Sequence, residues 1–354
     1  KLMITVNHTI ARKLIIRCLA SHKVPLLRSS PGMGKSSLIH QIAADGNFKV
    51  LDLRLAGCDP TDINGYPYLD PKTGAFTQVA LDAFPLCDRP LPSRMVDGVQ
   101  KPYSGWIILL DELTSASQAV QAAVYKPILD HMIGLRKIHP LAYIVGCGNL
   151  ETDNAVVEPL STALASRVIH INLHNDLDCF LNIAYERKFN QKIIAYITWK
   201  GLAGVTNFDP SNQADTYACA RTWEFMSDLM IKDMPDEEFT PLAAGTIGEA
   251  MGLEFSSFCS IFLDLPSIPA ILANPDTHFV PDRPDIQYAL TSALSGAVKP
   301  DNIGEIITYL SRLPAEIQMF TIRMMNMQHG TVFSSHPAFM PWVRKFSAYI
   351  NGAV

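Results

Sequence analysis

Eight consecutive residues near the N-terminus have the types and order of a phosphate-binding loop: Ser29-Ser30-Pro31-Gly32-Met33-Gly34-Lys35-Ser36. The segment follows an apolar run and opens a stretch of helical period, which is the context such a loop requires. The two glycines allow backbone N–H groups to converge on phosphate oxygens, Lys35 can reach the β- and γ-phosphates, and the Ser36 hydroxyl can bind Mg²⁺. We predict that a nucleoside triphosphate is bound by Ser30, Pro31, Gly32, Met33, Gly34, Lys35, Ser36 and Ser37.

One position departs from the usual pattern G-x-x-x-x-G-K-[ST], because Ser29 stands where the first glycine is expected. A serine at this position must avoid the positive φ angles that glycine tolerates. We therefore expect backbone strain, if there is any, at Ser29, with weaker nucleotide binding as its consequence. The alternative interpretation, a glycine-rich turn that only precedes a helix, is disfavoured by the strand–loop–helix context.

Two adjacent carboxylates follow a second apolar run. Trp106-Ile107-Ile108-Leu109-Leu110 predicts a buried strand, and Asp111 and Glu112 come directly after it. In open α/β sheets, ligands bind at the carboxyl ends of the strands. Asp111 is suited to hold Mg²⁺, and Glu112 is suited to activate the attacking water as a general base. The alternative is that the two acids only cap a following helix.

These two motifs resemble those of the AAA+ ATPases, and within them the MoxR-like branch of bacteria and their phages. Further segments follow in the order of that family. Asn149 is similar to the sensor-1 residue that positions the lytic water. Residues 59–67 resemble the segment that follows the second strand in MoxR-like proteins. Residues 160–167 resemble the stretch that ends in the arginine finger, here Arg167, and residues 220–224 resemble the sensor-2 helix with Arg221.

The resemblance implies an ATPase that uses ATP and Mg²⁺, with catalytic roles for Glu112, Asn149, Arg167 and Arg221. An arginine finger enters the active site of a neighbouring subunit, so the resemblance also implies a homo-oligomer, a hexameric ring by family precedent. Each role has a simpler alternative. Asn149 could cap a turn, Arg167 could be a surface residue at the start of a strand, and Arg221 could pair with Glu224 on its own helix.

The elements that would position these residues follow from the hydrophobic pattern. Short β-branched runs alternate with stretches of helical period up to about Leu173, and helical spacing dominates afterwards. The fold class we predict is α/β: a P-loop AAA+ domain with a parallel sheet flanked by helices, then a helical lid and a further α-helical region. The expected domains are 1–175, 176–264 and 265–354.

An insert of about residues 62–104 interrupts the first domain. Its part from Gly65 to Val79 has two β-like arms around a Lys72-Thr73-Gly74 turn, which predicts a projecting hairpin. Tyr66, Tyr68 and Phe76 could engage a polypeptide, or they could pack the hairpin onto the domain. Residues 133–138 could form a second such loop.

Composition narrows the function classes. The formal net charge is −5, which gives no electrostatic support for nucleic-acid binding. The seven cysteines form no C-x-x-C pair, which argues against a disulfide framework or a zinc site. We expect a soluble cytoplasmic protein, in a bacterial cell or a phage-infected host, with no membrane contact.

Three functions remain open from the sequence. The first is a motor that remodels or chaperones a protein client, for which the resemblance implies a von Willebrand factor A domain partner. The second is a nucleotide-dependent scaffold or switch with slow hydrolysis, and the third, disfavoured by charge, is a nucleic-acid motor.

Overall fold

The structure, a computed structural model, describes residues 4–150, 158–211, 215–230, 234–262 and 265–346. The chain divides into two compact units, residues 1–175 with 209–213 and residues 176–208 with 214–354. The predicted lid and the predicted C-terminal region both fall in the second unit. Their predicted boundary at residue 264 lies outside the described residues, so this division stays a prediction.

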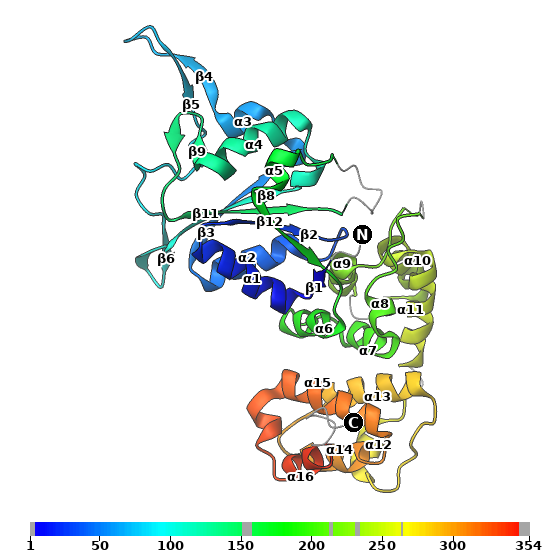
Figure 1. The fold of residues 1–354 in the computed structure, drawn as a ribbon. Helices are drawn as coiled ribbons and strands as arrows, with labels where there is room; N and C mark the ends of the chain where they lie inside the picture. The colour runs from blue at the N-terminus through cyan, green and yellow to red at the C-terminus, as the bar shows by residue number, and fades with distance from the viewer. Residues whose placement is uncertain (1–3, 151–157, 212–214, 231–233, 263–264, 347–354) are drawn as a thin grey trace. The chain divides into compact units, whose positions relative to one another are not determined.

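The first unit is built on a six-stranded sheet in the order β1-β12-β2-β11-β8-β3 (Figure 1). Its strands are β1 (Thr5–Val6), β2 (Val24–Arg28), β3 (Phe48–Arg54), β8 (Gly105–Asp111), β11 (Ala142–Gly148) and β12 (Val168–Leu173). Every neighbouring pair is parallel. Arg28 pairs with Gly148, and Leu110 pairs with Gly146. The carboxyl ends of β2, β11 and β8 therefore meet at one edge of the sheet.

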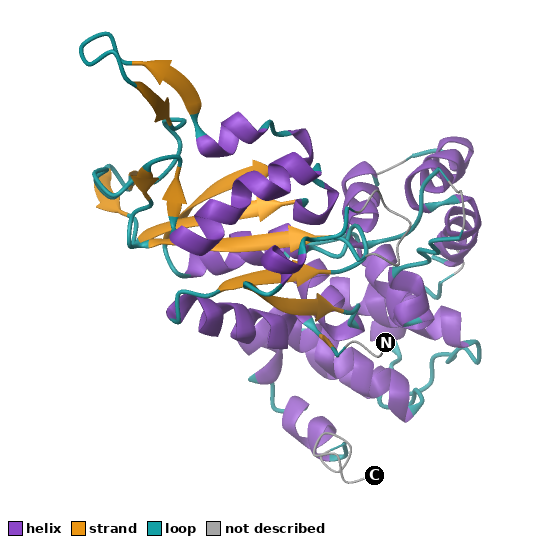
Figure 2. Ribbon diagram, turned by 45° about the horizontal axis from the view of Figure 1, so that its top comes forward, coloured by secondary structure: helices purple, strands orange, loops and turns teal. Residues whose placement is uncertain are grey.

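Helices cover both faces of this sheet (Figures 1 and 2). The helices α1 (His8–Ala20) and α2 (Lys35–Asp45) pack on one face, with α3 (Pro60–Asn64), α4 (Gln118–Asp130) and α5 (Thr162–Ala165) on the other. Successive residues of β8 alternate between two buried clusters: Ile107 and Leu109 face α1 and α2, whereas Ile108 and Leu110 face α4. A strand buried on both faces must be apolar throughout, which explains the uninterrupted run before Asp111.

Three antiparallel hairpins extend from this sheet unit. They are β4 (Tyr66–Leu69) with β5 (Phe76–Val79), β6 (Ser93–Val96) with β7 (Val99–Pro102), and β9 (Met132–Ile133) with β10 (Arg136–Lys137). The hairpin of β4 and β5 reaches away from the sheet (Figure 1). The hairpin of β6 and β7 was not expected, because its strands are short and largely polar and therefore lack a buried face that would produce a period-two pattern.

The second unit is helical in its described residues. Its first group of helices is α6 (Leu177–Glu186), α7 (Gln191–Lys200), α8 (Leu202–Val205), α9 (Ala220–Leu229), α10 (Asp236–Ile247) and α11 (Glu249–Ile261). Its second group is α12 (Ile268–Ala273), α13 (Pro284–Gly296), α14 (Ile303–Leu310), α15 (Ala315–Ser334) and α16 (Phe339–Arg344). Two buried clusters fill this unit: the first contains Tyr196 and Trp223 together with Ala289 of α13, and the second contains Tyr309 and Trp342.

The predicted fold class is thus confirmed: a parallel sheet flanked by helices is followed by a long helical region. None of the helices in the described part of the chain combines the length and the apolar character needed to cross a bilayer.

Candidate nucleotide-binding site

The predicted phosphate-binding loop connects β2 to α2 at the carboxyl edge of the sheet. Gly32 and Gly34 both have a φ of 74°, in the left-handed region where glycine is favoured. Ser29 is fully buried, and it is not among the described non-glycine residues that have a positive φ. The loop therefore accommodates serine at this position without a left-handed backbone, and the strain that we considered for Ser29 is not present.

Lys35 joins the loop to the end of strand β11. Its ammonium group donates to the carbonyl oxygens of Ser29 at 3.0 Å and Ser30 at 3.1 Å, and to the hydroxyl of Ser29 at 3.1 Å. It also donates to Oδ1 of Asn149 at 3.0 Å. These contacts bring together two residues that lie 114 positions apart, the predicted phosphate ligand and the predicted sensor. They also give the hydroxyl of Ser29 a role, because it is an additional hydrogen-bond acceptor for Lys35.

The two residues predicted to hold Mg²⁺ are in direct contact. The hydroxyl of Ser36, in the first turn of α2, donates to Oδ2 of Asp111 at 2.6 Å. Hydroxyl and carboxylate oxygens are ligands that Mg²⁺ prefers, with water and phosphate oxygens completing its octahedral shell. The donor set at this point therefore fits a magnesium ion bound together with a nucleotide.

Glu112 has a left-handed backbone, with φ 57° and ψ 30°. This conformation ends β8 and turns the chain into the short 3₁₀ helix η2 (Leu113–Ser115). For a residue other than glycine it costs roughly 1–2 kcal/mol, and such positions cluster at functional sites. The N–H of Glu112 donates to Oδ1 of Asp111 at 2.9 Å, and the side chain of Glu112 is exposed. An exposed carboxylate next to the two predicted Mg²⁺ ligands is suited to accept a proton from water.

The two predicted arginines lie elsewhere. Arg167 is exposed between α5 and β12, where its Nη1 donates to the carbonyl of Ala163 at 2.7 Å and its guanidinium lies 5.1 Å from the ring centroid of Tyr125. None of the contacts among the described residues joins Arg167 to Lys35 or to Asp111 of its own chain.

Arg221 is exposed on α9 in the second unit. The alternative partner considered for it, Glu224, instead accepts a hydrogen bond from Arg187 at 2.5 Å. Its predicted contact with the γ-phosphate stays a prediction.

Cys147 lies under the site on strand β11 and is fully buried. Burial strongly raises the pKa of its thiol, and the negative charge of Asp111 adds to this effect. The thiol therefore stays protonated at neutral pH, and Cys147 is a packing residue and not a nucleophile.

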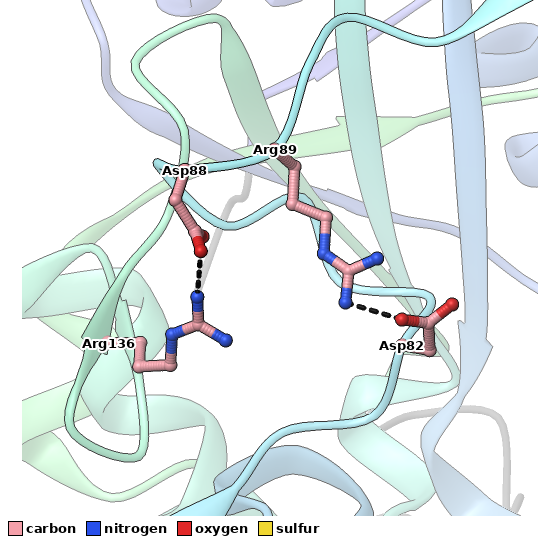
Figure 3. Close-up of polar contacts among 4 residues, drawn as sticks. All are labelled: Asp82, Asp88, Arg89 and Arg136. Atoms are coloured by element: carbon pink, nitrogen blue, oxygen red, sulfur yellow. Dashed lines mark hydrogen bonds and ion pairs between the residues drawn. The ribbon is translucent and has the colours of Figure 1, made fainter.

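Two ion pairs order the loop of residues 80–92 (Figure 3). Arg89 forms an ion pair with Asp82 at 2.5 Å, and both residues lie in the loop. Arg136 of β10 forms an ion pair with Asp88 of the same loop. The hydrogen bond from Arg89 lowers the pKa of the Asp82 carboxyl. Backbone hydrogen bonds from Cys87 to Lys137 at 3.0 Å and from His139 to Pro85 at 2.7 Å add to this connection. The insert and the hairpin of β9 and β10 are thereby joined.

Sequence reasoning missed Thr114, which contacts Asn149 from the buried segment η2. Thr114 stands two residues after Glu112, in a segment that also contains Ser115 and Ser117, so neither its type nor its spacing distinguished it from these other small hydroxyl residues.

Comparisons with known proteins give structural similarity only. No protein-family model and no characterised protein sequence matches this chain. The chain is similar to the structure of a candidate ATPase from Cytophaga hutchinsonii, with 14% identity, coverage of 97% of this chain and 90% of that chain, and a TM-score of 0.34. It is also similar to NtrX from Brucella abortus in complex with ADP, with 13% identity, coverage of 98% and 69%, and a TM-score of 0.40.

A second structure of NtrX, in complex with ATP, has 13% identity, coverage of 92% and 70%, and a TM-score of 0.40. The class of the first unit follows from the geometry of the chain itself. That geometry is an α/β domain of the P-loop type, in which the loop after β2 meets the acidic end of β8 and the polar end of β11.

Proposed function

We propose that this chain is an ATP-hydrolysing AAA+ motor of the MoxR-like type, which acts as a ring on a protein partner. The observation that carries the proposal is the pair of contacts at the edge of the sheet, Lys35 with Asn149 and Ser36 with Asp111. They place an ammonium group, a hydroxyl and a carboxylate around the mouth of a loop rich in backbone N–H groups. This combination of groups suits the binding of a triphosphate together with Mg²⁺.

In the proposed reaction, residues 30–37 hold the phosphates of ATP, and Ser36 and Asp111 hold Mg²⁺, which neutralises phosphate charge when bound. Glu112 takes a proton from the attacking water. The amide of Asn149 orients that water, while its contact with Lys35 keeps the amide at the phosphate end of the site. Each group acts by positioning and charge, as phosphoryl transfer requires.

Hydrolysis in this proposal also needs a second subunit. Arg167 is exposed and lies outside the Lys35 and Asp111 contacts of its own chain, as expected of a finger that serves a neighbour. A ring gives every site such a donor, and we propose a hexamer. Arg221 would report the nucleotide state to the helical lid.

The proposed partner is a polypeptide, with a von Willebrand factor A domain protein as one candidate. The hairpin of β4 and β5 supports this choice, since Phe76 is 79% exposed and Tyr66 and Tyr68 are each 48% exposed. Phe76 therefore leaves most of its surface in solvent, and Tyr66 and Tyr68 each leave nearly half of theirs. Exposed aromatic side chains on a projecting element are typical of surfaces that bind other proteins.

The test is ATP hydrolysis by the wild type and by Glu112→Gln, with nucleotide binding measured on both. We expect the variant to bind ATP normally and to hydrolyse it ~10²- to 10⁴-fold more slowly, because it lacks the base. A nucleotide-dependent scaffold would instead give equally slow hydrolysis in both proteins.

The same variant tests the partner. With ATP bound and not hydrolysed, Glu112→Gln should retain a client protein in a pull-down, and replacing Phe76 by Ala should release it. Recovery of only the chain itself would argue against a remodelling function.

A further inference from the structure

Thr114 is a buried polar residue that has no assigned part in the site. It lies in η2, two residues after Glu112, and the residue is 3% exposed. Its hydroxyl accepts a hydrogen bond from the backbone N–H of Asn149 at 2.8 Å and donates to the carbonyl oxygen of Asn149 at 3.3 Å. One hydroxyl thus satisfies both backbone groups of the same residue, 35 positions away in the sequence.

The surrounding backbone is shaped for this contact. A Cβ atom on Gly148 would lie 2.6 Å from both Oγ1 and Cγ2 of Thr114, so only glycine leaves room for the threonine. The carbonyl of Thr114 also accepts a hydrogen bond from the N–H of Glu158 at 2.8 Å. Thr114 therefore links the segment after β8 to the end of β11 and to the chain that continues toward Arg167.

We infer that Thr114 is a positioning residue for the proposed hydrolysis. Its hydroxyl fixes the backbone of Asn149, and this places the Asn149 amide 3.0 Å from the ammonium group of Lys35. Because Thr114 follows Glu112 by two residues, one short segment sets the position of both the proposed base and the proposed water-orienting amide. The inference rests on the proposed function, in which Asn149 acts on the water.

The role belongs to the hydroxyl and not to the volume of the side chain. Valine has nearly the shape of threonine but cannot accept from the N–H of Asn149, so that buried N–H loses its partner. Serine keeps the hydroxyl and lacks only the methyl group. The two substitutions therefore separate hydrogen bonding from packing.

The experiment compares single-turnover ATP hydrolysis and ATP affinity for the wild type, Thr114→Val and Thr114→Ser. We expect Thr114→Val to lower the hydrolysis rate about tenfold or more with ATP affinity changed less than about threefold, because the hydrogen bond positions a group that acts on the water. Thr114→Ser should restore most of the rate. Thr321→Val is the matched control, since Thr321 is also fully buried, lies in the second unit and donates to the carbonyl of Ile317 at 2.6 Å. It should leave the hydrolysis rate unchanged.

A double-mutant cycle with Asn149→Ala gives the decisive readout. If Thr114 acts through the Asn149 amide, adding Thr114→Val to Asn149→Ala should change the rate less than about twofold, whereas independent effects would multiply. Multiplying effects, or a wild-type rate for Thr114→Val, would overturn the inference. Should Thr114→Val fail to fold, Thr114→Ala takes its place in the cycle, since it also lacks the hydroxyl.

The same measurements distinguish the role of Asn149 from the role of Thr114. A wild-type rate for Asn149→Ala would refute the proposed role of Asn149 and with it the function of Thr114. A slow Asn149→Ala together with a fast Thr114→Val would refute only the role of Thr114.

Discussion

At the scale of single residues, Ser29 is the position where expectation and structure differ most. The sequence pattern suggested a strained substitute for glycine, but Ser29 is fully buried without a positive φ, and both its carbonyl and its hydroxyl accept from Lys35. The serine is therefore compatible with the loop and contributes one contact to the lysine.

This leads to a prediction for Ser29→Gly. The variant restores the usual pattern, yet we expect its ATP affinity to stay within about threefold of the wild type, because it loses one hydrogen bond of modest net value and relieves no strain. Isothermal titration of ATP into both proteins measures the difference. A large gain in affinity for the variant would show that the serine does strain the loop.

Some contacts between site residues could be predicted from the sequence motifs, and others could not. The pairing of Ser36 with Asp111 was predictable, because both residues belong to motifs whose chemistry requires a shared ion. The contact of Thr114 with Asn149 was not, because it depends on the parallel register of β8 and β11 and on the missing Cβ of Gly148. Both strands are buried almost throughout and are therefore apolar at nearly every position, so their sequences do not distinguish one register from the next.

At the scale of elements, two arginines have contrasting parts in the loop of residues 80–92. Arg136 of β10 reaches across to Asp88, whereas Arg89 pairs with Asp82 inside the loop (Figure 3). The pair of Arg136 with Asp88 therefore connects the loop to the β9 and β10 hairpin, whereas the pair of Arg89 with Asp82 lies within the loop alone.

We predict that Arg136→Ala increases hydrogen exchange in residues 80–92 and in the hairpin of β9 and β10. Both partners are at the surface, so the free energy of unfolding should change by no more than about 1 kcal/mol. Arg89→Ala, as the control, should affect residues 80–92 but leave the β9 and β10 hairpin protected. Unchanged exchange in Arg136→Ala would mean that the backbone hydrogen bonds alone hold the two elements together.

Helix α4 (Gln118–Asp130) follows the acidic end of β8 in the chain and contacts the exposed Arg167. It begins three residues after Ser115 of η2, and its Tyr125 packs against Arg167. The sequence predicted a helix in this region, because the apolar residues that α4 buries recur at helical spacing. The contact of Arg167 with Tyr125 could not be predicted, because Arg167 is exposed and does not belong to a periodic apolar pattern that would indicate its neighbours.

At the scale of the whole molecule, we propose that a neighbouring chain completes each hydrolytic site. Glu112 and Arg167 would then act in different subunits on the same ATP. Two variants that are each inactive should complement one another in a mixed ring, because a Glu112→Gln subunit still supplies Arg167 to a site that retains Glu112.

Mixing Glu112→Gln with Arg167→Ala and measuring ATP hydrolysis tests this claim most directly. Each variant alone should be at least about 10²-fold slower than the wild type, since both the base and the finger contribute orders of magnitude to the rate. The mixture should recover a substantial fraction of wild-type activity at concentrations where the chains assemble. A mixture as inactive as its two components, with assembly verified by size, would contradict hydrolysis built across subunits.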